Sequence, residues 1–231
     1  MNWLLAALRS SLGRKMIVAL TGLGLVGFVL AHLAGNLQVF AGREALNAYA
    51  QGLKDLGPLL WVARIGLLGI FVLHVVLALQ LARENRAARP SRYVHGGVQQ
   101  ATPGARSMVL TGVTILFFVA YHLAHFTFGA VHAEHYGVGA DALGRHDVYG
   151  MVVAGFSNPL VSILYIVSMG LLALHLSHGV QSVFQTLGLN GPRFQPLIKC
   201  AGLGLAVLVF VGNISMPLAI LLGLGPFSTG A

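Results

Sequence analysis

Five long stretches with almost no charge are the feature that most restricts how this chain can fold. They cover residues 16–42, 59–82, 107–133, 148–192 and 200–231, and their one Lys, Arg, Asp or Glu is Arg64. A helix needs about 20 apolar residues to cross the bilayer core, and Asn158-Pro159 marks a helix start inside the fourth stretch. The sequence therefore predicts five transmembrane helices, near 16–39, 59–82, 107–131, 159–187 and 199–224.

The composition excludes most other architectures. Charged residues make up 9% of the 231 residues and hydrophobic residues 56%, whereas soluble domains are about a quarter charged. The apolar runs lack the alternation of a β-barrel, and the single cysteine, Cys200, cannot build a multi-cysteine zinc or iron–sulfur site. We expect an all-α integral membrane protein in which residues 1–231 form a single transmembrane domain.

The basic residues are unevenly distributed between the two ends of the predicted helices. The N-terminal tail and the gaps after helices two and four hold 10 of the 14 basic residues, while the other end holds four, with five of the six acids. The positive-inside rule then places the N-terminus in the cytoplasm and the C-terminus outside, in the inner (cytoplasmic) membrane. The net charge of +8 forms no basic stripe with aromatics, so no nucleic-acid partner is expected.

Six of the ten histidines fall inside predicted helices, where ionisable side chains are costly and usually functional. Four of them, one on each of the first four helices, lie at two depths about 10 Å apart when 1.5 Å is counted per residue. His32 and His122 form the outer layer, and His74 and His175 form the inner layer. The remaining two, His125 and His178, each follow one helical turn later.

An internal repeat selects the same four histidines. Thr21-Gly22 precedes His32 by the spacing at which Thr111-Gly112 precedes His122, and Gly-x-x-x-Leu-His occurs both at 69–74 and at 170–175. The chain therefore resembles a duplicated helical hairpin followed by a fifth helix, with a pseudo-twofold axis along the membrane normal. Such an axis places equivalent histidines opposite one another.

Paired histidines across a helix bundle are what a bis-imidazole haem requires. We predict that His32 and His122 ligate an outer haem iron and His74 and His175 an inner one, so that four helices form a haem-binding bundle. Small residues would let a porphyrin approach the backbone, although they equally mediate helix packing: Gly22, Gly24, Gly27, Gly35, Gly66 and Gly69.

Alternatives to these ligands remain. His125 and His178 are possible ligands, but the repeat does not reproduce them, and contacts to haem propionates or quinone suit them better. His132, Glu134 and His135 loosely resemble a metal-binding pattern, although a solvated loop is the favoured interpretation.

The same residues resemble a known family, the di-haem cytochrome b (b558-type) membrane anchors of succinate:quinone oxidoreductases and fumarate reductases. The resemblance covers nearly the whole chain. Its segments are Ser-Ser-Leu-Gly-Arg-Lys at 10–15, Thr21-Gly22 through His32-Leu-Ala-Gly-Asn36, Leu-His74, Thr111-Gly112 through Tyr121-His122, and the stretch from His175 to Gly188.

The resemblance implies two haems b and two partner subunits on the cytoplasmic face, a flavoprotein with succinate/fumarate chemistry and an iron–sulfur protein. Electrons would pass between the iron–sulfur subunit and a quinone, with menaquinone expected at the outer side. It also implies that His74 and His175 hold the haem nearer the partners and His32 and His122 the distal one. Some fumarate reductases of the family have a glutamate two residues before the helix-four ligand, but Ala173 stands there, so that proton path is in doubt.

The sequence gives weaker signals for the quinone site and for the class of complex than for the haem ligands. Asn36 and Arg64 are possible quinone contacts near the outer haem, and Arg64 either pairs with a haem propionate or extends to the interface. The arginine-rich gap from Arg83 to Arg106 is expected to meet the soluble partners or lipid headgroups. Two alternatives remain, a di-haem cytochrome b of a hydrogenase or formate dehydrogenase and a haem-free transporter.

Overall fold

The computed structural model describes residue 6, residues 10–88 and residues 103–228, and these are almost entirely helical. Five helical segments are long and apolar enough to cross a membrane, which confirms the predicted all-α, multi-pass membrane character. Within the described ranges no strand is present beyond one isolated bridge between Ala140 and His146.

The five long helices agree with the predicted ranges to within a few residues at most ends. They are α2 (Ser11–Asn36), α4 (Pro58–Ala87), α5 (Pro103–His122), α8 (Pro159–Thr186) and α9 (Gln195–Leu221). Capping explains two of the starts: the Ser10 hydroxyl accepts from Gly13 N at 3.0 Å, and the Asn158 side chain accepts from Leu160 N at 3.0 Å. The start of α8 at Pro159 is therefore set by the Asn-Pro pair that the sequence analysis identified.

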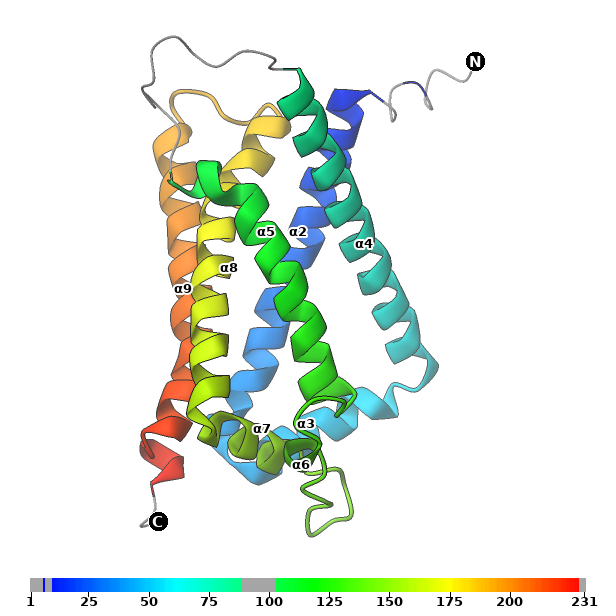
Figure 1. The fold of residues 1–231 in the computed structure, drawn as a ribbon, viewed down its shortest axis with the longest axis vertical. Coiled ribbons are helices and arrows are strands. Elements are labelled where there is room, and N and C mark those ends of the chain that lie inside the picture. Colours follow the sequence, from blue (N-terminus) through cyan, green and yellow to red (C-terminus); the bar gives the residue numbers. More distant parts are fainter. Residues whose placement is uncertain (1–5, 7–9, 89–102, 229–231) are drawn as a thin grey trace.

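The connections at the end of the bundle opposite the N-terminus, called the outer end below, contain helices that were not predicted. They are α3 (Arg43–Asp55), α6 (Ala133–Tyr136) and α7 (Val148–Ser157), and Figure 1 shows α3 and α7 lying across the end of the bundle opposite the N-terminus. With 13 and 10 residues, α3 and α7 are too short to span a bilayer. A search for long apolar runs passes over helices of this length.

The long helices pack as two hairpins and a fifth helix. In the first hairpin α2 packs against α4, and in the second α5 packs against α8. Helix α8 also contacts α2, which joins the hairpins, and α9 packs extensively on α8 (Figure 1). This arrangement follows the duplicated-hairpin organisation that the repeat predicts. The largest buried cluster lies at the outer end, where Leu33, Phe156, Tyr165 and Met216 meet.

Polar networks fasten both ends of the bundle. At the end that bears the N-terminus, Arg14 on α2 donates to both carboxylate oxygens of Glu84 on α4, at 2.5 and 2.8 Å. At the outer end, Arg145 donates to Glu44 on α3 at 2.6 Å and pairs with Asp141 at 2.7 Å. Hydrogen bonds from Arg145 hold the pKa of Asp141 well below its usual value.

A second part of the outer network links α3 to α7 directly. Arg43 pairs with Asp147, whose carboxylate also accepts from Asn47 at 3.0 Å and from Gly150 N at 3.0 Å. Burial acts to raise the pKa of Asp147, but the hydrogen bonds and the Arg43 charge outweigh it and leave the pKa lowered. The charges at this end are therefore largely paired with one another.

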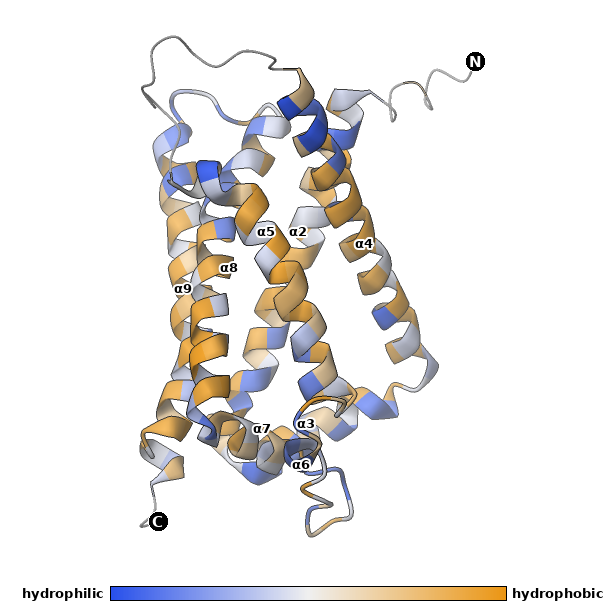
Figure 2. Cartoon of the chain, viewed as in Figure 1, coloured by the Kyte–Doolittle hydropathy of each residue, from blue (hydrophilic) through white to orange (hydrophobic). Residues whose placement is uncertain are grey.

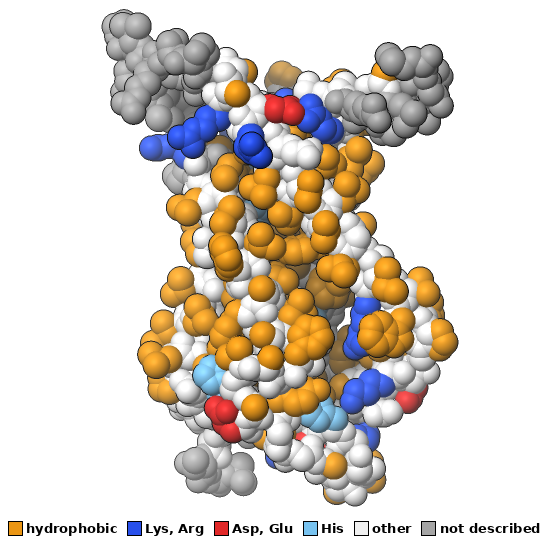
Figure 3. Space-filling view, turned by 45° about the vertical axis from the view of Figure 1, so that its right-hand side comes forward, with side chains coloured by type: hydrophobic (Ala, Val, Ile, Leu, Met, Phe, Trp, Pro, Cys, Tyr) orange, Lys and Arg blue, Asp and Glu red, His pale blue; other side chains and the backbone are white. Residues whose placement is uncertain are grey.

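The middle of the molecule presents apolar side chains to its surroundings. Figure 2 shows hydrophobic residues along all the long helices and hydrophilic ones concentrated towards their ends. In Figure 3 the Lys, Arg, Asp and Glu side chains visible on that face gather mainly towards its two ends. Such a belt fits a lipid bilayer, because lipid chains solvate exposed apolar groups that water would not.

Candidate functional site

The inner histidine of the first hairpin is held by the neighbouring helix through one ring nitrogen. His74 Nδ1 on α4 lies 3.1 Å from Val18 O and 3.1 Å from Thr21 Oγ1, both on α2. Thr21 donates its own hydroxyl proton to Ile17 O at 2.7 Å. Its oxygen is therefore left to accept the Nδ1 proton of His74.

The second hairpin repeats this arrangement. His175 Nδ1 on α8 lies 3.2 Å from Thr111 Oγ1 on α5. Thr111 donates to Ser107 O at 3.0 Å, as Thr21 donates to Ile17 O. Thr21 and Thr111 are the first residues of the two Thr-Gly pairs, so one function of the repeat is to hold the inner histidines.

These contacts fix the tautomer of both inner histidines. Val18 O beside His74 only accepts hydrogen bonds, and Thr111 beside His175 already donates its hydroxyl proton to Ser107 O, so Nδ1 of each ring holds the proton. Nε2 of His74 and of His175 then has a free lone pair, which is the state a metal-ligating imidazole needs. Donation of the other ring N–H to a backbone carbonyl is the usual support of a histidine ligand.

The glycine of each Thr-Gly pair explains the rest of that repeat. A Cβ on Gly22 would lie 3.2 Å from His74 Cε1, and one on Gly112 would lie 3.3 Å from His175 Cε1. Both distances are tighter than ordinary van der Waals contact, so an alanine would press on the ring. The pair thus supplies a hydrogen-bond acceptor and the space for the imidazole beside it.

The other glycines expected to face a porphyrin fall into two groups. A Cβ on Gly24 would meet Ile70 at 3.1 Å, and one on Gly35 would meet the Tyr49 ring at 2.5 Å, so both allow close packing within the protein. Around Gly27, Gly66 and Gly69 no atom lies within 4 Å of an added Cβ. Space beside the backbone is therefore present at these three positions.

The outer histidines face each other across the bundle. The rings of His32 on α2 and His122 on α5 are 5.8 Å apart between centres and nearly perpendicular, at 87°. Two imidazoles bonded to one metal ion at about 2 Å each have ring centres about 6 Å apart. Phe28 stacks on His32 at 5.3 Å, and Phe118 and Phe126 flank His122 at 6.0 and 5.9 Å. The pair has the spacing of axial ligands within an aromatic, apolar wall.

The two additional histidines differ in their surroundings. His125 lies on a π-helical turn, Leu123–Thr127, and is fully buried. Its Nδ1 is 3.3 Å from Tyr165 Oη, which is also 3.3 Å from His122 Nδ1, and its Nε2 is 3.1 Å from His135 Nδ1. Both nitrogens of His125 are thus engaged by the protein. His178 is half-buried one turn beyond His175.

The two candidate quinone contacts lie towards the outer end. Asn36 is the last residue of α2 and is half-buried. Arg64 on α4 is exposed, and its guanidinium carbon lies 5.1 Å from the centre of the Trp61 ring. An arginine stacked on tryptophan near a helix end fits the membrane interface. This favours the interfacial role for Arg64 over a haem propionate contact.

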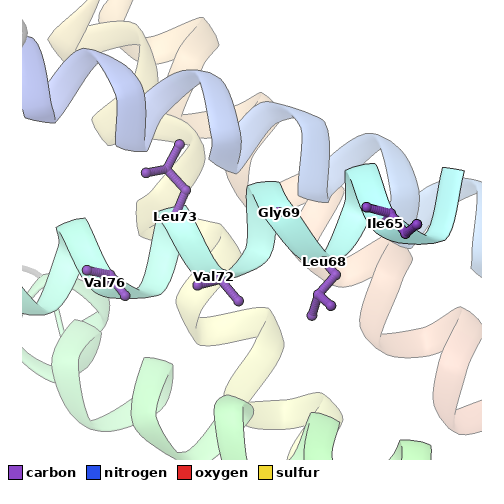
Figure 4. Close-up of a pocket in the computed structure, with 6 residues that line it drawn as sticks. All are labelled: Ile65, Leu68, Gly69, Val72, Leu73 and Val76. Atoms are coloured by element: carbon purple, nitrogen blue, oxygen red, sulfur yellow. The ribbon is translucent and has the colours of Figure 1, made fainter. Parts of the chain in front are cut away.

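An open groove along α4 is not part of the histidine site. Figure 4 shows its lining, which is entirely apolar: Ile65, Leu68, Gly69, Val72, Leu73 and Val76. At 3.6 residues per turn all of these positions except Leu73 lie on the side of α4 away from His74, so the space beside Gly69 belongs to this groove and not to the histidine site. The groove is exposed on the apolar belt, and its lining offers no side chain that would bind a polar group.

Tyr165 is the main residue of the histidine site that the sequence does not predict. It lies on α8, is buried, and joins His122 to His125 through its hydroxyl. The threonines were recognised only as repeat markers, although their equal spacing from a histidine was the available signal. Tyr165 left no such signal, because it contacts residues about 40 positions away.

Comparisons with known proteins leave the family of this chain open. No family model, no curated protein and no solved structure matches it. The function of the chain therefore has to be inferred from the geometry of its histidines.

Proposed function

We propose that the chain is the membrane-anchor cytochrome b subunit of a succinate dehydrogenase or fumarate reductase, with two haems b. The observation that supports this most is the matched pair of inner histidines, each with Nδ1 held by a threonine hydroxyl and Nε2 left with its lone pair. The outer pair adds a ring separation suited to a shared iron. Four such histidines on four helices suit two bis-imidazole sites.

The chain's residues would position two haems in series across the membrane. His74 and His175 would bind the iron nearer the cytoplasm, and His32 and His122 the iron nearer the outside. A haem supplies reversible one-electron transfer at its iron, and its axial ligands and surroundings set the potential. The apolar wall around the ligands excludes water, and the Nδ1 hydrogen bonds keep the inner imidazoles oriented.

The partners follow from the same proposal. Flavoprotein and iron–sulfur subunits would dock on the cytoplasmic face and hold the succinate/fumarate chemistry, and this chain would react with a quinone, menaquinone, towards the outer side. Arg83, Arg86 and Arg106 lie on helices at the N-terminal end of the bundle, where they suit an acidic partner surface. Arg89 and Arg92, from the same predicted docking segment, lie outside the described residues.

The haem content of purified chain and of single variants tests the proposal. We expect two haems b per chain in a pyridine haemochrome assay. His74→Ala and His175→Ala should each remove the same inner haem, and His32→Ala and His122→Ala the same outer one, because a bis-imidazole site loses its haem with either ligand. His125→Ala and His178→Ala are the matched controls and should keep both haems.

Three results would redirect the assignment. A haem-free chain would favour the transporter alternative. Loss of a haem in His178→Ala with retention in His175→Ala would exchange the ligand on α8. Copurification with hydrogenase or formate dehydrogenase subunits, in place of a flavoprotein and an iron–sulfur protein, would support the second class of di-haem cytochrome.

A further inference from the structure

The outer connection between α5 and α7 gathers side chains that the proposed function does not use. His132, Glu134 and His135 each offer one ligand atom, and these atoms all lie within 4.8 Å of one another. Glu134 Oε1 is 3.5 Å from His132 Nδ1 and 3.8 Å from His135 Nε2. The sequence predicts a solvated loop here. In the structure, Glu134 is the one residue of the three that is largely exposed, at 69% of its side chain.

The backbone of this connection is folded onto the bundle. Ala130 N donates to Ala124 O at 2.8 Å, and His135 N donates to His132 O at 2.9 Å. Gly129 has a φ of 62°, and the Tyr136 ring lies 2.6 Å from where its Cβ would be, so no other residue fits there without rearrangement. The three side chains are therefore presented by a defined turn.

The rings of His132 and His135 are also oriented by contacts with each other and with the buried His125. His132 and His135 stack with centres 4.9 Å apart. The Nδ1 atom of His135 lies 3.1 Å from Nε2 of the fully buried His125, which leaves Nε2 of His135 facing Glu134. A hydrogen bond from the non-ligating ring nitrogen to a buried acceptor is the support that metal-binding histidines usually have.

We propose that His132, Glu134 and His135 form a binding site for a divalent transition-metal cation of the zinc type on the outer face. Zn²⁺ accepts imidazole nitrogen and carboxylate oxygen at about 2.0–2.2 Å, and neighbouring ligand atoms around it are about 3.3 Å apart. The carboxylate oxygen, at 3.5 and 3.8 Å from the two nitrogens, is close to this geometry, and the two nitrogens, which lie within 4.8 Å of each other, must approach further. Water completes the coordination, because the exposed side of Glu134 opens to solvent.

The chemistry of the three ligands selects the class of metal. Two imidazoles and one carboxylate suit zinc, copper and nickel, whereas Ca²⁺ and Mg²⁺ prefer all-oxygen sites. With metal on Nε2, His135 must hold its proton on Nδ1 and donate it to His125 Nε2. His125 then donates from Nδ1 to Tyr165 Oη, whose second lone pair accepts from Nδ1 of His122, so these hydrogen bonds each have a donor and an acceptor and Nε2 of His122 keeps its lone pair.

Zinc binding to the full-length chain in detergent, after removal of metal with a chelator, tests the site. We expect isothermal titration with ZnCl₂ and metal analysis after desalting to give one saturable Zn²⁺ per chain, with Mg²⁺ failing to compete. Glu134→Gln and His132→Gln should each weaken zinc binding at least tenfold, since each removes one of three ligands. Glu134 is exposed and His132 is partly exposed, so the fold should persist, and an unchanged helical circular dichroism spectrum checks this.

His146→Gln is the matched control, because His146 is another histidine of the same outer connection but does not belong to the cluster. It should bind zinc as the unmodified chain does. Absence of saturable zinc binding, or equal binding in Glu134→Gln and His132→Gln, would overturn the site. The haem proposal is tested separately, because His32→Ala and His74→Ala should lose haem and still bind zinc.

Discussion

At the scale of single residues, the two threonines beside the inner histidines give the site its most specific chemistry. A histidine has two possible neutral tautomers, and only one leaves Nε2 free for a metal. Thr21 with the Val18 carbonyl selects that tautomer for His74, and Thr111 selects it for His175. A hydrogen bond at Nδ1 also increases the electron donation of the ring to a bound iron.

Thr111→Val should therefore shift the midpoint potential of the proposed inner haem upwards while both proposed haems are retained. Valine keeps the shape of threonine but removes the acceptor, so the ring donates less electron density and the oxidised iron is less stabilised. One hydrogen bond of about 1 kcal/mol corresponds to a shift on the order of tens of millivolts. Redox titration of the visible spectrum measures it.

Thr114→Val is the control for that experiment. Thr114 is half-buried on the same helix, and its hydroxyl donates to Leu110 O at 2.9 Å. Its replacement should leave both potentials unchanged. Equal shifts in the two variants would show that the hydrogen bond to His175 has no part in setting the potential.

At the scale of elements, the short helices α3 and α7 close the outer end of the bundle. Asp147 caps α7 by accepting from Gly150 N and also receives Arg43 and Asn47 from α3. One carboxylate thus begins one helix and attaches another. Since Leu46 on α3 and Phe156 on α7 belong to the outer core cluster, this attachment also fixes the wall near the outer histidines.

Removing this carboxylate should destabilise the outer end. Asp147→Ala loses a helix cap of about 1 kcal/mol, or roughly 2–4 °C in the melting temperature of a chain this size.

The stability of this end should also depend on pH, because the folded pKa values of Asp141 and Asp147 are lowered. Their stabilisation is therefore complete above the unfolded pKa of about 4 and is lost as pH falls through the lower folded values. Thermal unfolding in detergent from pH 7 to pH 2.5 measures both effects.

Asp55→Ala provides the comparison at the same end of the molecule. Asp55 is exposed at the end of α3 and accepts one hydrogen bond, from Gln51 at 2.8 Å. Its loss should change the melting temperature by less than the loss of Asp147. A melting temperature that Asp147→Ala leaves unaltered would rule out the role of Asp147 in holding the outer end.

At the scale of the whole molecule, charge separates the two ends of the apolar belt. The described basic residues at the N-terminal end include Arg14, Lys15, Arg83, Arg86 and Arg106, with Glu84 as the acid of that end. At the other end, Arg43 and Arg145 are paired with Asp147, Glu44 and Asp141. Unpaired positive charge at one end favours that end for the cytoplasm.

Cysteine labelling tests this orientation. Cys200 is the single cysteine, so Cys200→Ser gives a background without thiols. Leu143→Cys, at a position 70% exposed in the outer connection, should react with a membrane-impermeant maleimide from outside intact cells. Leu189→Cys, 55% exposed between α8 and α9, should react only in inverted vesicles. The reverse pattern would invert the topology.

From the sequence alone one can predict a membrane-spanning protein with five long helices, and one can find the repeat that singles out four histidines. Apolar length and charge are local properties, and the cost of placing charge or unpaired backbone in lipid makes them decisive. The start of α8 was equally local, because Asn158 and Pro159 act on their own helix.

The contacts between particular side-chain atoms are visible only in the three-dimensional structure. It showed that Thr21 and Thr111 hold His74 and His175, that Tyr165 joins His122 to His125, and that three residues of the outer connection converge. These contacts join residues up to tens of positions apart, and they depend on the rotation and depth at which the helices pack. Helical periodicity fixes the face on which a side chain lies, but packing of one helix against another fixes its partner.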